Sequence, residues 1–268
     1  MTHRIAVVLL SGGVDSTTCL YHAYHAKPSY QELHAVSVNY GQRHLKETVY
    51  AKFSCDLLGV PHHMLEVPNV FPKSMLTDEK AAVPDISYSD IVGVSPTYVP
   101  FRNGTMLSLI TAFTEGLVKN AEQDLGIQAR AGDYEGGEPV EADIYFGAHA
   151  EDAANWAYPD CTPEFIGAMA NAIYIGSYRR IRLCTPLEWL DKTHVIMHGQ
   201  ELHVPWQNTW SCYKGLELQC GTCPTCRSRR EGFENAGVYD PTVYADMAEG
   251  EKAARTYDHE ANEEMPSA

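Results

Sequence analysis

A short segment of glycine and hydroxyl residues near the N-terminus is the first part of this sequence suited to chemistry. Residues 11–16 read Ser-Gly-Gly-Val-Asp-Ser and directly follow an apolar β-type run at residues 5–10. Glycines between a strand and a helix expose backbone N–H groups at the positive end of the helix dipole, so an anion can approach the backbone closely. The segment therefore predicts a phosphate-binding loop. A plain strand-to-helix turn with Asp15 or Ser16 as the N-cap is the alternative.

Four cysteines near the C-terminus form a second chemical cluster, with the spacing C-x7-C-x2-C-x2-C. Four thiolates close a tetrahedral Zn²⁺ site and leave no position for water, which predicts a structural metal site. A redox dithiol and an iron–sulfur cluster are the alternatives. The predicted ligands are Cys212, Cys220, Cys223 and Cys226. The arginines at 227, 229 and 230 either form a solvated helix face or offset the charge of the metal centre.

Composition and charge narrow the function classes. The 268-residue chain has 20 basic and 35 acidic side chains and a net charge of −15 at pH 7, so we expect no nucleic-acid partner. No apolar run approaches the roughly 18 residues that span a bilayer, so we expect no membrane partner. Clustered cysteines without a secretory signal favour a metal in a reducing cytoplasm over a disulfide framework. We expect a cytoplasmic protein that acts on small molecules, and a homodimer is left open.

The elements that must position these groups alternate along the chain. Strand-like runs lie at 5–10, 33–38 and 143–147, with weaker ones at 62–67 and 181–184. Helix-compatible stretches lie at 16–26, 44–58, 104–121 and 162–174. This alternation predicts an α/β fold with a doubly wound, mostly parallel, Rossmann-like sheet. We expect a nucleotide-binding domain over residues 1–208 and a small helical zinc-binding region with an acidic tail over 209–268. Residues 68–97 and 128–143 are predicted to be surface segments.

The glycine loop matches neither the GxGxxG nor the GxxxxGK[ST] signature. It resembles the SGGxDS loop of the PP-loop ATP pyrophosphatases, which release AMP and pyrophosphate from ATP. The resemblance implies that the loop grips the phosphates of ATP and that Asp15 helps to hold Mg²⁺. The predicted ATP-binding residues here are Leu10, Ser11, Gly12, Gly13, Val14, Asp15, Ser16 and Thr17. Ser11, Asp15 and Ser16 are also predicted to be catalytic.

Further motifs, in the same order along the chain, resemble the 7-cyano-7-deazaguanine synthases of queuosine precursor biosynthesis. They are NYGQRHLKE at 39–47, YVPFRN at 98–103, YPDCTPEF at 158–165 and TWSC at 209–212. The resemblance implies that 7-carboxy-7-deazaguanine and ammonia become the 7-nitrile through an adenylated carboxylate and an amide, with two ATP converted to AMP and pyrophosphate. Catalysis would come mainly from positioning and charge stabilisation. The alternatives are a PP-loop amidotransferase or ligase that stops at the amide or a conjugate, and a non-catalytic ATP-binding module.

The segment after the second strand should face the ligand, because open α/β sheets bind ligands at the carboxyl ends of their strands. Tyr40 is a predicted nucleotide contact, and Gln42 and Arg43 are predicted substrate contacts. His44 is the group of this motif that titrates near neutral pH, so it is predicted to be catalytic and to handle protons as ammonia attacks. A merely exposed loop histidine is the alternative.

Polar residues further along the chain are also predicted to bind the substrate. Arg102 and Asn103 would bind phosphate or carboxylate oxygens, a bidentate task suited to arginine. The N1–H and 2-amino groups of a guanine-like base would pair with a carboxylate, either Asp160 or the pair Glu151 and Asp152. Each of these acids is equally suited to capping a helix or lying on the surface.

Two departures from the family pattern lie near these residues. Phe101 stands where the family commonly has glycine, and the segment 148–158 looks slightly longer than usual. Both leave the ATP chemistry untouched and bear on the acceptor and on the product form.

Overall fold

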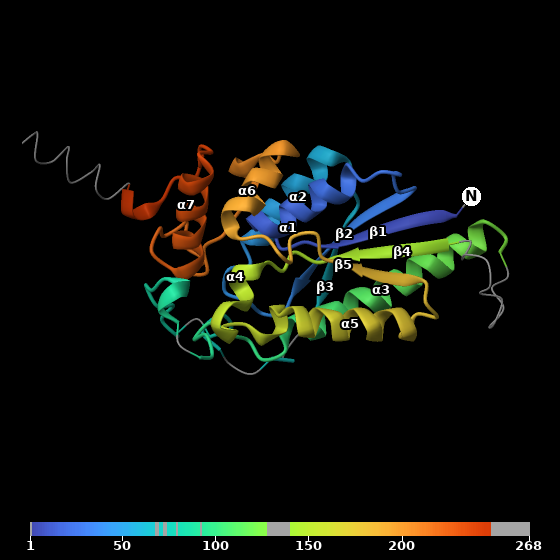
Figure 1. The fold of residues 1–268 in the computed structure, drawn as a ribbon, viewed down its shortest axis with the longest axis horizontal. Helices are drawn as coiled ribbons and strands as arrows, with labels where there is room; N and C mark the ends of the chain where they lie inside the picture. The colour runs from blue at the N-terminus through green and yellow to red at the C-terminus, as the bar shows by residue number, and fades with distance from the viewer. Residues whose placement is uncertain are drawn as a thin grey trace, which may run out of the picture.

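A parallel sheet of five strands forms the centre of the computed structural model (Figure 1). The structure describes residues 2–67, 70–71, 74–78, 80–91, 93–127 and 140–247. The strand order is β3-β2-β1-β4-β5, and every neighbouring pair is parallel. The strands are β1 His3–Leu9, β2 Glu32–Asn39, β3 His62–Glu66, β4 Val140–Tyr145 and β5 Ile181–Cys184. The predicted α/β fold with a mostly parallel sheet is confirmed.

Helices cover both faces of the sheet. In β1, Ile5 and Val7 are buried with side chains of α3 and α5, whereas Ala6 and Val8 are buried with side chains of α1, α2 and α6. This alternation follows from the two-residue period of a strand with two covered faces. The helices are α1 Val14–Tyr24, α2 Glu47–Leu58, α3 Arg102–Asp124, α4 Ala150–Ala153, α5 Pro163–Gly176, α6 Lys192–Glu201 and α7 Pro224–Ala236. Short 3-10 turns are η1 Tyr88–Asp90, η2 Ala154–Trp156, η3 Pro159–Cys161 and η4 Trp206–Asn208.

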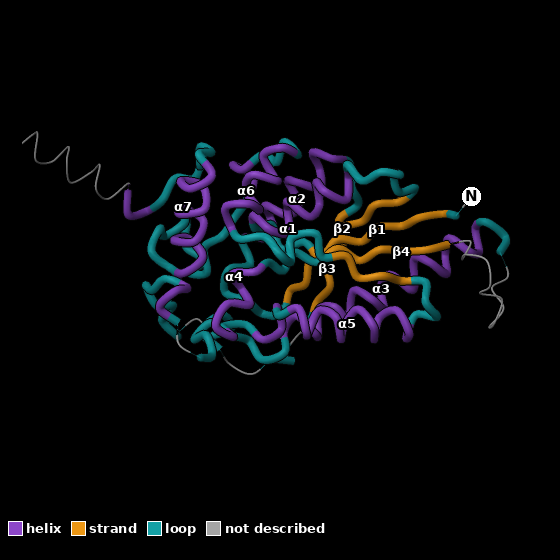
Figure 2. The backbone as a smooth tube through the Cα atoms, viewed as in Figure 1, coloured by secondary structure: helices purple, strands orange, loops and turns teal. Residues whose placement is uncertain are grey.

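The chain reverses its direction across the sheet at β1. It runs outward from β1 through β2 to β3, and then returns to the other side of β1 to add β4 and β5. The gap between the ends of β1 and β4 is therefore the switch point at which open α/β sheets bind ligands. The tube in Figure 2 shows loops gathered at this end of the strands, between the sheet and α7.

The predicted strands and helices differ from the observed ones mainly at their ends. The strand predicted at 143–147 is Val140–Tyr145, and the helix predicted at 44–58 begins only at Glu47. Helix α6 was not predicted, because its sequence is mixed in polarity and lacks a clear apolar period. Most of the predicted insertion at 128–143 and nearly all of the acidic tail lie outside the described residues. In the described ranges no helix is both long and apolar enough to cross a membrane.

The C-terminal region packs onto the α1 face of the sheet. Phe233 of α7 is buried in the same cluster as Leu20 and Ile196. Arg229 is 1% exposed and pairs with Asp240 at 3.0 Å, so it does not belong to a solvated helix face. The division into units at residues 208 and 209 stays a prediction.

Candidate active site

The loop between β1 and α1 wraps around the hydroxyl group of Ser16. The backbone N–H groups of Ser11 and Gly12 donate to Ser16 Oγ at 3.1 and 3.2 Å, and Ser11 Oγ lies 3.0 Å from the same atom. Gly13 is the N-cap residue of α1 and no side chain caps the helix. The alternative of an Asp15 or Ser16 N-cap is therefore wrong. The first turn of α1 keeps N–H groups for an anion.

The two glycines of the loop have different structural roles. Gly12 has a φ of +90°, and a Cβ added to it would lie 2.2 Å from Glu47 O and 2.7 Å from Ala51 N. Gly12 therefore lets the loop pack directly against α2. A Cβ on Gly13 would meet only ordinary contacts, at 3.4 Å from Ser11 Oγ and 3.5 Å from Trp210 O. The fold needs a glycine at position 12, whereas position 13 has room for a Cβ and lines a cavity.

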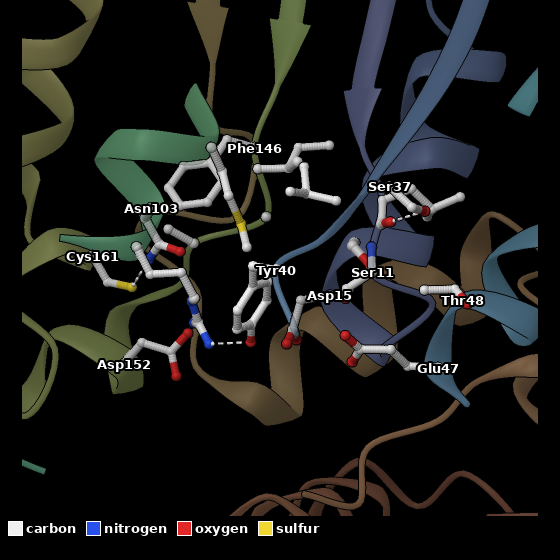
Figure 3. Close-up of a pocket in the computed structure, with 18 of the residues that line it drawn as sticks. Ser11, Asp15, Ser37, Tyr40, Glu47, Thr48, Asn103, Phe146, Asp152 and Cys161 are labelled. Carbon is white, nitrogen blue, oxygen red and sulfur yellow. Dashed lines mark hydrogen bonds between the residues drawn. The ribbon is translucent and has the colours of Figure 1, made fainter. Parts of the chain in front are cut away.

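A cavity of about 190 Å³ opens beside this loop, between the ends of β1, β2 and β4 and the start of α3 (Figure 3). A second cavity of about 110 Å³ adjoins it, and the two share Ser11, Asp15, Glu47, Asp152 and Tyr213 in their walls. We call the two cavities together the cleft. Predicted site residues that line it are Leu10, Ser11, Gly13, Val14, Asp15, Ser16, Tyr40, His44, Arg102, Asn103 and Asp152.

A buried lysine from a distant helix holds Asp15. Lys192 Nζ lies 2.6 Å from Asp15 Oδ1 and 3.0 Å from His149 Nε2, and His149 Nε2 lies 3.4 Å from Asp152 Oδ2. Burial raises the pKa of Asp15, but the charges of Lys192 and His149 outweigh it and hold that pKa below its usual value. Asp15 is therefore a carboxylate at neutral pH, which suits a metal ligand.

Glu47 and His44 face each other across the opposite wall of the cleft. His44 Nε2 lies 3.6 Å from Glu47 Oε1; the His44 side chain is buried, and that of Glu47 is 14% exposed. Burial lowers the pKa of His44 to about 3, with Arg102 and Arg43 acting in the same direction. Burial raises the pKa of Glu47 to about 8. The predictions that His44 titrates near neutral pH, or is an exposed loop residue, are thus wrong, because the ring is enclosed. Glu47 is the group that titrates in that range.

The start of α3 forms the third wall. Arg102 Nη1 donates to Tyr40 Oη at 3.3 Å, and the guanidinium lies 5.9 Å from the centre of that ring. The backbone N–H of Asn103 donates to Asp160 Oδ2 at 2.9 Å, and its side-chain nitrogen donates to Asp160 O and Cys161 Sγ. Asp160 therefore caps α3 and positions Asn103.

Several predicted substrate residues lie behind the cleft wall. Gln42 donates to Val38 O and Glu47 Oε1, and Arg43 donates to the backbone of Ala81. Glu151 accepts from the backbone N–H of Lys192 at 2.9 Å and from Ser228. The predicted site residues that do not line the cleft are Gly12, Thr17, Gln42, Arg43, Glu151 and Asp160. Of the acids predicted to bind a guanine-like base, only Asp152 faces the cleft.

Residues that the sequence analysis missed include Glu47 and Lys192, which line the cleft, and His149, whose Nε2 lies 3.7 Å from Asp15 Oδ2. Glu47 ends the NYGQRHLKE motif, three residues after His44. Side chains three residues apart lie on the same side of a helical turn, so this spacing could have indicated that Glu47 lies beside His44. His149 and Lys192 belong to no quoted motif, and only the fold brings them to Asp15.

The family departure at Phe101 has a local structural explanation. Phe101 has a φ of +53°, in the left-handed region that favours glycine. Its ring packs edge-on to Phe165 at 5.8 Å and lies over Gly104, where an added Cβ would come 2.4 Å from the ring. Phe101 is 55% exposed and lies outside the cleft wall, as does the 3-10 turn Ala154–Trp156 in the lengthened segment.

The four clustered cysteines converge on one point. All four are buried, and their sulfur atoms lie within 4.8 Å of one another. Cys220 Sγ and Cys226 Sγ are 3.9 Å apart, close to the roughly 3.8 Å expected of thiolates around a tetrahedral zinc. Backbone N–H groups point at the sulfurs, from Cys220 to Cys212 and from Thr222 and Cys223 to Cys220. The donor set fits a metal ion.

The sulfur cluster is joined directly to the loop between β1 and α1. The backbone N–H of Trp210 donates to Gly12 O at 2.8 Å, and its indole N–H donates to Cys212 O at 3.0 Å. The segment that supplies the first cysteine therefore also holds the loop between β1 and α1.

Comparisons with known proteins agree with this arrangement. A family model described as queuosine biosynthesis protein QueC matches residues 5–136 and 138–237. A 7-cyano-7-deazaguanine synthase from Caldicellulosiruptor bescii is 38% identical and aligns with 89% of this chain and 96% of its own. That from Thermoplasma volcanium is 37% identical, over 91% of this chain and 92% of its own. The 7-cyano-7-deazaguanine synthase from Alteromonas mediterranea is 34% identical and aligns with 89% of this chain and 97% of its own.

Proposed function

The chain belongs to the family of queuosine biosynthesis protein QueC, and from this premise we propose that it forms 7-cyano-7-deazaguanine from 7-carboxy-7-deazaguanine and ammonia, using ATP. The observation that carries the proposal is the SGGVDS loop, which opens at the switch point of the sheet into a cleft lined by Ser11, Asp15 and Ser16. The motifs NYGQRHLKE and YVPFRN supply the opposite wall of the same cleft.

The reaction needs activation of oxygen twice. A carboxylate oxygen leaves poorly, and adenylation turns it into part of a good leaving group. Ammonia then displaces AMP and gives the amide. Adenylation of the amide oxygen by a second ATP, followed by loss of AMP, leaves the nitrile. One ATP loop is able to serve both rounds, and the chemistry rests on positioning and charge stabilisation.

The phosphates of ATP are proposed to bind at the start of α1. Open N–H groups in the first turn and the space beside Gly13 support this placement. Asp15 would hold Mg²⁺, which would neutralise charge on the phosphates, and the low pKa of Asp15 supports that role. Lys192 is the cation available to the same phosphates.

The deazapurine is proposed to bind between Tyr40, Arg102 and Asp152. Arg102 suits the carboxylate of the substrate, and the carboxylate of Asp152 suits the N1–H and 2-amino groups of the base. These contacts are supported by the position of all three side chains in the cleft wall. Asp160 and Glu151 are proposed to act on the site only through Asn103 and Lys192.

The cysteine cluster is proposed to hold one Zn²⁺ with a structural role. Four buried thiolates leave no open coordination position, and the Trp210 contacts tie the cluster to the phosphate loop. The reaction itself is not routed through this ion.

The setting of the reaction completes the proposal. Free ammonia is the proposed nitrogen donor and the cytoplasm is the proposed compartment, because reduced thiols persist there. The sequence leaves a homodimer open, which light scattering would test.

Counting AMP against product tests the function. The chain is incubated with Mg·ATP and either 7-carboxy-7-deazaguanine plus an ammonium salt or the corresponding amide alone, and products are identified by mass. We expect two AMP per nitrile from the acid and one from the amide without added ammonia. One AMP from the acid, with the amide inert, would instead identify an amide-forming ligase. ATP bound with no AMP released would identify a binding module.

A further inference from the structure

Two carboxyl groups of the cleft lie in opposite electrostatic environments. Asp15 is paired with Lys192 at 2.6 Å and has a pKa below its usual value. Glu47 has no lysine or arginine nitrogen within ion-pair distance among the described residues, and its nearest ionisable partner is His44 at 3.6 Å. Because burial keeps His44 neutral, the charge of Glu47 is offset only in part, by Arg102, and burial is the larger effect on its pKa. Such a divergence between two neighbouring acids is typical of a division between electrostatic and proton-transfer roles.

Glu47 is oriented by its own segment. Its Oε1 accepts from Gln42 Nε2 at 3.4 Å and faces His44 Nε2, whereas its Oε2 makes no hydrogen bond among the described residues. The side chain stands at the first residue of α2 and lines both cavities of the cleft. Figure 3 shows it pointing into the space that Asp15 and Tyr40 also face. One carboxyl oxygen is thus held in place and the other is open to a bound molecule.

We propose that Glu47 is the base that removes protons from the reacting nitrogen in both halves of the reaction, an inference that rests on the proposed function. In the first half, the ammonia nitrogen forms a bond to the acyl carbon of the adenylate, and the carbon–oxygen bond to AMP breaks. AMP leaves with the electron pair, and a proton passes from nitrogen to Glu47 Oε2. Glu47 then passes this proton to water. In the second half, the adenylated amide is an imidate with one N–H left, its other proton having gone to water during adenylation. The carbon–oxygen bond to AMP breaks, AMP leaves with that electron pair, the nitrogen gives its last proton to Glu47 Oε2, and the electrons of the N–H bond complete the triple bond.

The environment of Glu47 makes it a better base than the other acids of the cleft. Burial raises its pKa to about 8, opposed in part by Arg102 and Gln42. Proton transfer is most efficient when the pKa of the base lies near the working pH. Asp15, held below its usual pKa by Lys192 and His149, is too weak a base. The hydrogen-bond partner of Glu47 is Gln42, and the titratable residues that line the cleft with it are Asp15, Tyr40, His44, Tyr88, Arg102, Asp152, Cys161, Lys192, Tyr213 and Arg229.

The amide-to-nitrile half-reaction isolates the proton transfer because it needs no ammonia. Its rate is therefore not affected by the change in ammonia concentration that comes with the titration of ammonium. Wild type, Glu47→Gln and Glu47→Asp are compared for this step between pH 6 and 9. For wild type we expect the rate to rise with pH through about 8. Glu47→Gln should be slower by at least about 100-fold and should lose this rise. Glu47→Asp should recover part of the rate and keep the pH dependence.

Adenylation is measured separately, by exchange of labelled pyrophosphate into ATP in the presence of the carboxylate substrate. Glu47→Gln should keep this exchange within about threefold, because the base acts after adenylation. The matched control is Asp56→Asn, an exposed acid on the same helix whose ion-pair partner among the described residues is Lys52, and it should match wild type in both assays.

Three outcomes would overturn the assignment. A Glu47→Gln variant that forms nitrile at the wild-type rate with the wild-type pH dependence is not missing a base. One that loses pyrophosphate exchange in proportion to nitrile formation has lost nucleotide or magnesium binding instead. If wild type itself releases no AMP from acid or amide, the proposed function fails together with the role of Glu47, and this failure is visible without any variant.

Discussion

Lys192 Nζ lies 2.6 Å from Asp15 Oδ1, although 177 residues separate the two in sequence. Lys192 is the first residue of α6 and is 8% exposed, while Asp15 sits in the first turn of α1. Each charge compensates the other inside the cleft. A bound phosphate group would compete for the lysine, and a magnesium ion for the aspartate, so the pair is where we propose that the ATP phosphates bind.

Replacing Lys192 by methionine should therefore damage both stability and ATP binding. Removing the lysine leaves Asp15, whose side chain is 26% exposed, with His149 as its nearest partner at 3.7 Å, at a cost of about 1–3 kcal/mol in unfolding free energy. The double variant Lys192→Met with Asp15→Asn should recover most of that stability but no activity. Urea unfolding and calorimetric ATP titration measure the two effects. The exposed pair Lys52 and Asp56 is the control, and Lys52→Met should change stability by less than about 1 kcal/mol.

If the Lys192→Met variant unfolded like wild type and bound ATP with unchanged affinity, the lysine would have no role at the phosphates. Equal loss of stability in the single and double variants would show that the fold depends on the lysine for packing rather than on its charge.

Glu47 should make the stability of the protein fall as the pH rises. Its pKa is 4.5 in an ordinary setting and about 8 in the fold, so the native state binds a proton that the unfolded chain has already lost between these values. The unfolding free energy should therefore decrease between about pH 4.5 and 8, by up to about 1.4 kcal/mol per pH unit from this group. The Glu47→Gln variant lacks this titration.

Urea unfolding of wild type and Glu47→Gln at several pH values checks this prediction. The variant should be the more stable of the two near pH 8, and the difference should shrink toward pH 5. Parallel curves at every pH would mean that the carboxyl keeps an ordinary pKa in the fold.

The two glycines of the phosphate loop should separate folding from binding. In Gly12→Ala the new Cβ would clash with Glu47 O and Ala51 N, and the φ of +90° would be strained, so we expect a loss of several kcal/mol in stability. In Gly13→Ala the Cβ finds ordinary contacts, so the melting temperature should stay near that of wild type while ATP binding weakens by at least about tenfold. Thermal melts and ATP titrations of both variants provide the comparison. If Gly13→Ala bound ATP with the wild-type affinity, the proposal that the phosphates bind beside Gly13 would be wrong.

The features that the sequence predicted are those set by local residue order. Two features are recognisable from residues that are close together in the sequence. They are the buried strand that runs into SGGVDS and the four cysteines within fifteen residues. The Lys192 contact with Asp15 depends on where α6 packs in the fold, so no spacing of residues in the sequence predicts it. Likewise, the sequence does not show that Glu47, rather than His44, has a pKa near neutral. This follows from burial, which lowers the pKa of an imidazole and raises that of a carboxyl group. Asp160 was predicted in the substrate site because a sequence motif does not say which way its side chain turns.

The contact between Trp210 and Gly12 predicts that the metal cluster controls ATP binding from a distance. Changing any one of the four clustered cysteines to serine, or removing the metal with a chelator, should release the 209–226 segment, because metal binding and local folding are coupled. Trp210 would then lose its hydrogen bonds to Gly12 O and Cys212 O, and the loop between β1 and α1 would lose a restraint. Elemental analysis should find about one zinc per wild-type chain, and its loss should bring a change in tryptophan fluorescence together with weaker ATP binding.

A cysteine outside the cluster provides the control for this effect. Cys19 is buried in α1 and Cys184 lies at the end of β5, and neither lies in the cluster. Serine at either position should cost packing energy while leaving the metal content and the Trp210 fluorescence unchanged. An iron–sulfur absorption band in the wild-type protein would show that the four cysteines hold an iron–sulfur cluster and not zinc. Zinc loss that left ATP affinity unchanged would show that the Trp210 contact does not transmit order from the cluster to the loop.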